Sequence, residues 1–223
     1  MNLPFDLNGK TILIAGSWED LTVGQTIDLL QWASGNEKDL VTLASIVSSI
    51  DKSELLDLPY EIITKIAAPA YNFIMETKLD KDEWQCPKEF RCGENVYKTS
   101  IDPGLMNYGC MEIFEKTISN ESTNFCEKIP LMLASMIYKG KFKNREIEAR
   151  KEIEDIANNE VMKMPVYIAY PVSAFFLNKL QISVQKQREA MKVIPNSKPA
   201  LELKSWKSLV SSARFIRSQK AIR

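Results

Sequence analysis

The sequence predicts a mainly α-helical, bundle-like fold with one or two small β-hairpins, so that α+β character is minor. Several stretches repeat apolar residues every three or four positions, which is typical of amphipathic helices. An Asn-Gly pair between two short apolar runs indicates a tight hairpin turn. The chain of 223 residues is 45% hydrophobic and 26% charged. These are ordinary globular values, and a chain of this length can bury a core without disulfide bonds.

The first expected elements are a hairpin and a capped helix. Residues 5–15 place Asn8-Gly9 between apolar runs, which predicts a β-hairpin. Thr22 with Gln25 three positions later has the pattern of a capping box, so a helix should begin there.

The next stretches predict three more helical segments. Residues 40–50 are apolar nearly all round, which indicates a buried helix. A short segment follows at 54–58, and a longer helix at 60–75 contains Pro69, which should kink or break it.

The polar residues 76–92 are the best internal boundary, and a similar series of elements is expected beyond them. Cys92-Gly93-Glu94 could turn a second hairpin. Asp102-Pro103 predicts a helix start, with Asp as the cap and Pro at the first helical position. Residues 129–138 should form a second buried helix.

The two buried helices share a sequence pattern. Leu43–Val47 reads LASIV and Leu133–Ile137 reads LASMI. An internal duplication would explain this pattern. The alternative is that two buried helices draw on the same common residues, Leu, Ala and Ser.

The second half also holds a charged and an apolar stretch. Residues 145–158 alternate acidic and basic side chains, which favours a solvated helix surface over a carboxylate metal site. Residues 165–180 are strongly apolar, and they form either the core of this half or an interface that includes Phe175 and Phe176.

Charge is divided unevenly along a chain that is neutral overall. The segment from Lys179 to Arg223 has eleven basic and two acidic residues, against 29 of each in the whole chain. That segment therefore carries a net charge of +9 and the rest carries −9.

We predict a hairpin-plus-helix unit at 1–80, a second helical unit at 81–180 and a basic linker and arm at 181–223.

Residues 201–223 form a basic amphipathic pattern that follows a proline-flanked linker. A solvated tail, a membrane-surface helix, a nucleic-acid arm and a subunit-docking arm all fit such a pattern. We favour docking, because phosphate binding needs charge but no apolar stripe. The predicted partner-binding residues are Trp206, Leu209, Lys204, Lys207, Arg214 and Arg217, together with Phe175 and Phe176.

The residue types present leave little basis for catalysis. The chain has no histidine, which removes the catalytic triads and imidazole metal ligands. The four cysteines have irregular spacing, so reduced and partly buried thiols are expected rather than zinc ligands. No glycine-rich phosphate loop, signal peptide or membrane-spanning run is evident. We therefore expect no enzyme activity, no cofactor, no metal and a cytoplasmic location.

Three stretches resemble known phage proteins. Gly16–Gln25 (GSWEDLTVGQ), with Ser53–Leu58 (SELLDL) after a buried helix, resembles the tail assembly chaperones of tailed bacteriophages. Ala169–Leu177 (AYPVSAFFL) looks like virion-region proteins of phages that infect Bacteroidota, a group that includes the crAss-like phages. The chain is longer than such chaperones and adds a basic tail, which leaves a permanent structural role open.

The resemblance implies a non-enzymatic role in head–tail or tail assembly, as a ring or connector subunit or as an assembly chaperone. Its partners would be further copies of itself and other virion, tail or portal proteins. It would act in the host cell cytoplasm during assembly, or stay in the virion. The alternative function is nucleic-acid binding through the basic C-terminal segment.

Overall fold

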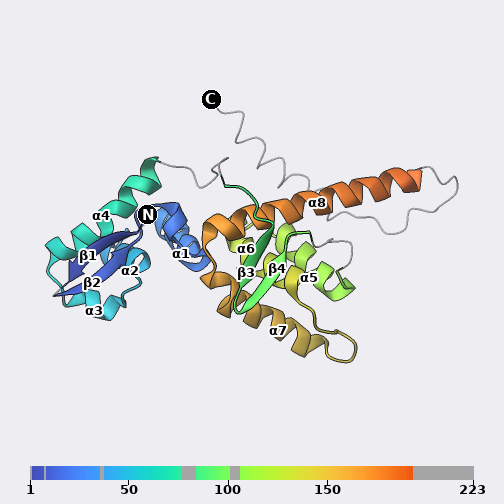
Figure 1. Cartoon of the computed structure of the whole chain (residues 1–223), viewed down its shortest axis with the longest axis horizontal. Coiled ribbons are helices and arrows are strands. Elements are labelled where there is room, and N and C mark those ends of the chain that lie inside the picture. Colours follow the sequence, from blue (N-terminus) through green and yellow to red (C-terminus); the bar gives the residue numbers. More distant parts are fainter. Residues whose placement is uncertain (1, 8, 36–37, 77–83, 101–105, 193–223) are drawn as a thin grey trace. The chain divides into compact units, whose positions relative to one another are not determined.

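The computed structural model describes residues 2–7, 9–35, 38–76, 84–100 and 106–192. Within these ranges the chain has eight α-helices and two separate two-stranded antiparallel sheets, which confirms the predicted fold class (Figure 1). It divides into two compact units. The first comprises Met1–Gln85 with Met162–Pro171, and the second comprises Cys86–Val161 with Val172–Arg223. Our sequence-based division had placed residues 162–171 with the second unit.

The elements of the first unit are β1 (Leu3–Leu7), β2 (Lys10–Ile14), a 3₁₀ turn η1 (Trp18–Asp20), α1 (Val23–Ser34), α2 (Leu40–Ser48), α3 (Lys52–Leu56) and α4 (Tyr60–Glu76). Those of the second unit are β3 (Glu89–Cys92), β4 (Asn95–Lys98), α5 (Tyr108–Ser119), α6 (Phe125–Ile137) and α7 (Glu146–Asn159). A 3₁₀ turn, η3 (Val161–Lys163), and α8 (Val166–Lys192) contribute residues to both units.

The first hairpin turns at Gly9, as its sequence predicts. Gly9 has a φ of +79°, which a residue without a side chain adopts at low cost, and its amide donates to Asp6 Oδ1 at 2.8 Å. The register pairs Phe5 with Ile12 and Leu3 with Ile14. Phe5, Ile12 and Ile14 pack into the core of the first unit, so one face of this small sheet is covered.

The capping box that starts α1 is also confirmed. Thr22 Oγ1 accepts from the Gln25 amide at 3.3 Å, and Gln25 Oε1 accepts from the Thr22 amide at 3.0 Å. The rest of the Gln25 side chain reaches α2, where its Nε2 donates to the carbonyl of Ile46 at 2.7 Å. One residue therefore caps one helix and contacts the last turn of another.

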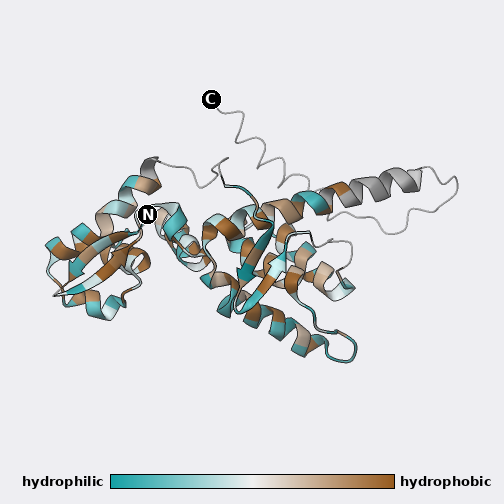
Figure 2. Cartoon of the chain, in the orientation of Figure 1, coloured by the Kyte–Doolittle hydropathy of each residue, from teal (hydrophilic) through white to brown (hydrophobic). Residues whose placement is uncertain are grey.

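The core of the first unit lies among α1, α2 and α4. Leu29, Leu43 and Ile66 are fully buried, and the ring of Trp18 meets that of Phe73 edge-on at 5.3 Å between centroids. Pro69 does not break α4, which continues past it to Glu76. Figure 2 shows hydrophobic and hydrophilic residues alternating along the helices, as amphipathic helices require.

A late part of the chain completes this first unit. The Val23 amide donates to the carbonyl of Met164 at 2.9 Å, and the Val166 amide donates to the carbonyl of Leu21 at 3.0 Å. Val166 is fully buried and belongs to the same core cluster as Leu43. Residues 162–171 are thus tied to the start of α1 by both backbone pairing and apolar packing.

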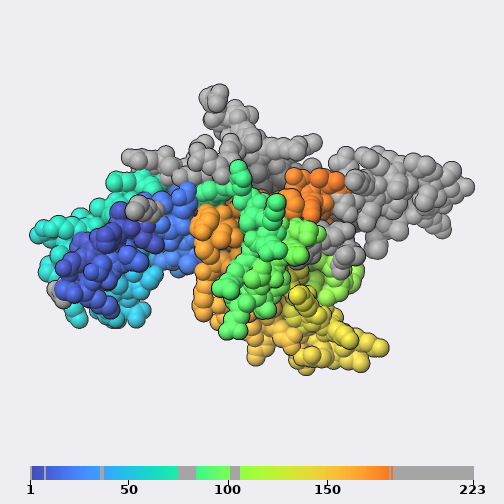
Figure 3. Space-filling model, in the orientation of Figure 1, coloured from blue at the N-terminus to red at the C-terminus, as the bar shows by residue number. Residues whose placement is uncertain are grey.

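The second hairpin is open to view on the surface of its unit (Figure 3, green). Gly93 provides the turn with a φ of +57°. The rings of Phe90 and Tyr97, which face each other across the strands, stack with centroids 5.7 Å apart. Strand β3 begins at Glu89, inside the polar stretch 76–92 that the sequence indicated as an internal boundary.

Helix α5 begins later than its sequence suggested. Asn107 is its N-cap, with Oδ1 accepting from the Cys110 amide at 2.9 Å. The predicted cap, Asp102-Pro103, lies outside the described residues.

The core of the second unit surrounds α6, in which most residues are buried and the others are partly buried. Phe114 from α5, Ile129 from α6 and Phe176 from α8 are fully buried. Lys128 is 7% exposed and donates to the carbonyl of Ile118 at 2.9 Å, near the end of α5. Burial lowers the pKa of this ammonium, and the bond to a carbonyl near the helix C-terminus offsets part of its desolvation.

Candidate docking surfaces

An apolar groove opens on the first unit, between the start of α2 and the α3–α4 corner. Its volume is about 470 Å³, and we refer to it as the α2–α4 groove. It is lined by Lys38, Asp39, Leu40, Val41, Leu55, Leu56, Leu58, Tyr60 and Ile63.

Local structure holds the two walls of this groove in place. On one side, Asp39 caps α2 by accepting from the amides of Val41 at 3.1 Å and Thr42 at 3.0 Å. The Thr42 hydroxyl also donates to Asp39 and lowers the pKa of its carboxyl, so this carboxylate is ionised at neutral pH beside Lys38. On the other side, Pro59 separates α3 from α4 and turns the chain between them.

The groove has a buried floor and an exposed apolar rim. Leu55 and Ile63 form the floor at 0% and 3% exposure. Leu56 and Tyr60 stand on the rim at 70% and 73% exposure, which is high for such large apolar side chains. Exposed apolar residues gathered around a concave site are typical of contact surfaces.

The rim is also acidic. Residues 51–61 contain four carboxylates and one lysine, a net charge of −3. Glu54 and Asp57 flank the leucine pair of the groove and are exposed. Glu61 is paired with Lys65 at 2.7 Å on the solvent side of α4. The groove therefore combines an apolar interior with a negative border.

A second concave site lies on the second unit, where β3, β4 and α8 meet. Its volume is about 410 Å³, and it is lined by Lys88, Glu89, Lys98, Thr99, Ser100, Phe175 and Lys179. We call it the lysine pocket. Lys179 Nζ lies 4.6 Å from the centre of the Phe175 ring and 3.5 Å from the Thr99 carbonyl oxygen. This ammonium covers one part of the aromatic face.

The structure separates the two phenylalanines that the sequence suggested as partner-binding. Phe175 is partly exposed and lines the lysine pocket. Phe176 is fully buried in the second unit, so it is a core residue here and not part of an accessible surface. Neighbouring residues of a helix point about 100° apart, which is why one faces the pocket and the other the core. The other predicted partner-binding residues, namely Trp206, Leu209, Lys204, Lys207, Arg214 and Arg217, lie outside the described residues.

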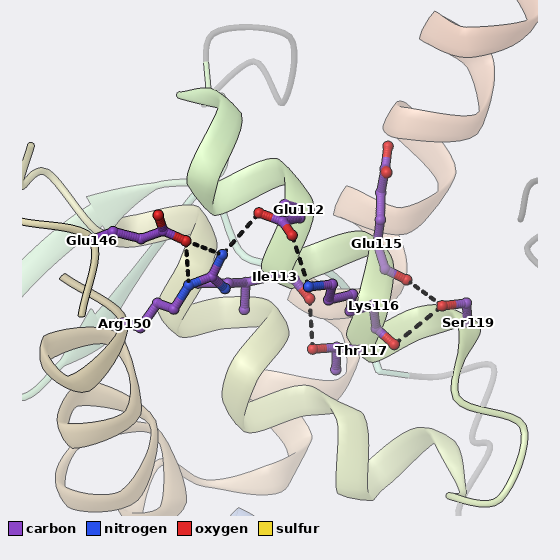
Figure 4. A network of polar contacts seen from close by, with 8 residues as sticks. All are labelled: Glu112, Ile113, Glu115, Lys116, Thr117, Ser119, Glu146 and Arg150. Carbon is purple, nitrogen blue, oxygen red and sulfur yellow. Dashed lines mark hydrogen bonds and ion pairs between the residues drawn. The ribbon is translucent and has the colours of Figure 1, made fainter. Parts of the chain in front are cut away.

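The charged face of α7 forms ion pairs rather than a metal site. Figure 4 shows Arg150 between Glu112 of α5, at 2.8 Å, and Glu146 of α7, at 2.9 Å. Glu112 also pairs with Lys116 at 2.7 Å. Among the residues that the structure describes, no three Cys, Asp or Glu side chains gather closely enough to hold a metal ion.

The cysteines are packed as structural residues. Cys92, Cys110 and Cys126 are buried and Cys86 is half-buried, which agrees with the predicted reduced thiols. Burial raises the pKa of Cys92 and of Cys126 to about 12, with Glu160 and Glu127 respectively adding to the effect. Both stay protonated at neutral pH, and a protonated thiol is a poor nucleophile and a poor metal ligand.

No helix among the described ranges is both long and apolar enough to cross a bilayer. Comparison of the chain with models of protein families, with characterised proteins and with solved structures finds no match.

Proposed function

We propose that this protein is a non-enzymatic morphogenesis protein of a tailed phage. It acts in head–tail or tail assembly as an oligomeric ring or connector subunit, or as an assembly chaperone. In this proposal it works by docking its basic C-terminal segment onto a partner, either a further copy of itself or another virion, tail or portal protein. The phage assignment rests on the sequence resemblance of Gly16–Gln25, Ser53–Leu58 and Ala169–Leu177.

The observation that carries the docking role is the α2–α4 groove. It leaves Leu56 and Tyr60 largely exposed on a concave apolar surface with an acidic border. The C-terminal segment has the opposite charge and an apolar stripe centred on Trp206. Interfaces of this kind depend on a few large buried anchors, with complementary charge speeding their encounter.

The test is the oligomeric state of the full-length protein over a range of concentrations, measured by sedimentation velocity. We expect concentration-dependent assembly, and Trp206→Ala should weaken it by about 2 kcal/mol, the loss typical of an interface hot spot. Tyr108→Ala is the matched control, because Tyr108 is an aromatic residue of the second unit with 85% exposure. A wild-type protein that stays monomeric at every concentration, alone and with co-expressed virion proteins, would contradict the proposal.

A second candidate, nucleic-acid binding, is favoured by one observation, the lysine pocket. Lys88, Lys98 and Lys179 converge there around the half-buried ring of Phe175. Against this reading, Glu89 also lines the pocket and Lys179 already covers the ring. A salt series separates the two functions, because nucleic-acid affinity falls steeply with salt whereas an apolar contact persists.

A further inference from the structure

We infer that the α2–α4 groove of one copy is the acceptor for residues 201–217 of a second copy, an inference that rests on the proposed function. The contact would then join two different surfaces, the groove of one copy and the C-terminal segment of the next. Such a heterologous contact repeats from copy to copy, and it closes into a ring when the rotation between copies allows.

The apolar parts of the two surfaces match in kind. The segment places Leu203, Trp206, Val210 and Ala213 at the three- and four-residue intervals of one helix face. Amphipathic helices bind to apolar grooves through anchors at this spacing. The groove offers a fully buried floor at Leu55 and two exposed apolar rim residues, and its volume is within the range of sites that enclose a bound group.

The charges of the two surfaces are opposite. Residues 201–217 contain four basic residues and one acidic residue, a net charge of +3. The groove border at 51–61 has a net charge of −3, with Glu54 and Asp57 exposed beside the apolar rim. A basic amphipathic helix seated on Leu56 and Tyr60 would keep its lysines and arginines near these carboxylates. The occupant we infer is therefore basic and amphipathic, and this chain carries such a segment.

The first experiment is a charge reversal with rescue in the full-length protein. Glu54→Lys with Asp57→Lys should raise the dissociation constant of assembly about tenfold or more, because like charges then oppose each other across the contact. Lys207→Glu with Arg214→Glu should do the same, and the four changes together should restore most of the affinity. Glu148→Lys with Glu154→Lys is the matched control, since it makes the same charge change at exposed sites of α7.

A second experiment identifies the copy that donates the segment. A photo-crosslinking residue replaces Leu56, which is 70% exposed and therefore tolerant of change, and light copies are mixed with heavy-isotope copies. Crosslinks from position 56 to residues 201–217 that join light to heavy chains support the inference. Crosslinks confined within one copy, or absent from this segment, overturn it.

The outcomes distinguish a failure of the groove assignment from a failure of the proposed function. If Trp206→Ala weakens assembly but the groove variants behave like the α7 control, the groove assignment is wrong and the docking role stands. If the wild-type protein does not assemble under any condition, both fail. Circular dichroism of each variant checks that the fold is retained.

Discussion

Gln25 offers a direct test of how the first unit is held together. Its side chain accepts from the Thr22 amide at 3.0 Å, and its Nε2 donates to the Ile46 carbonyl at 2.7 Å and to Ser49 Oγ at 3.0 Å. Gln25→Ala removes the reciprocal half of the capping box and a bond to the last turn of α2. Each net hydrogen bond contributes roughly 0.5–1.5 kcal/mol. We therefore expect a loss of about 2 kcal/mol in the free energy of unfolding.

Gln25→Glu separates the two roles of this residue. Glutamate keeps an acceptor for the Thr22 amide, but it loses the donor to Ile46 and brings a negative charge to the carbonyl end of α2. If Gln25 stabilised the unit only through the capping box, Gln25→Glu would be as stable as the wild type. Because the link to α2 is lost, we expect it to be destabilised by about 1 kcal/mol or more.

Urea unfolding followed by tryptophan fluorescence measures these changes. Trp18 and Trp32 are buried in the first unit, and a Trp206→Phe background removes the tryptophan of the C-terminal segment. A Gln25→Ala variant within about 0.5 kcal/mol of the wild type, less than a single net hydrogen bond, would refute the assigned role.

Three further predictions follow from packed residues and from composition. Burial raises the pKa of Cys126 from 9.0 to about 12, so the stability that the protonated thiol contributes is full below pH 9 and falls as the pH rises toward 12. Cys126→Ala should therefore make the loss of stability with rising alkaline pH less steep, as followed by circular dichroism. Gly93→Ala and Gly9→Ala should each cost about 1 kcal/mol or more in thermal unfolding, because both positions need a positive φ; a Cβ at Gly93 would also meet the flexible Glu160 side chain, which can move aside. Metal analysis should find no stoichiometric zinc, and zinc lost together with the fold on chelation would contradict the expected absence of a metal.

The features that the sequence predicted are those that depend on near neighbours in the chain. The turn at Gly9 and the Thr22–Gln25 capping box each involve residues within a few positions of one another, so local patterns are sufficient. The burial of α6 was also predicted, because residues 129–138 are largely apolar and leave little surface suited to water.

The features that the sequence did not predict have two causes: a choice between competing local caps, and packing between distant residues. The start of α5 is set by the Asn107 cap, although Asp102-Pro103 has the stronger pattern. Phe175 and Phe176 look alike in sequence, and only the packing of α8 decides which of them is buried. The α2–α4 groove is lined by residues of α2, α3 and α4 together, and no local sequence pattern predicts this.

The assignment of residues 162–171 to the first unit has a consequence for biosynthesis. The ribosome synthesises this chain from its N-terminus. The hydrogen bonds of the Val23 amide with Met164 and of the Leu21 carbonyl with Val166 therefore cannot form until all of residues 86–161 have been made. The core of the second unit waits as well, because it needs Phe176 from α8. Neither unit can complete its core before that helix is synthesised, so a nascent chain ending before residue 166 leaves both cores unfinished.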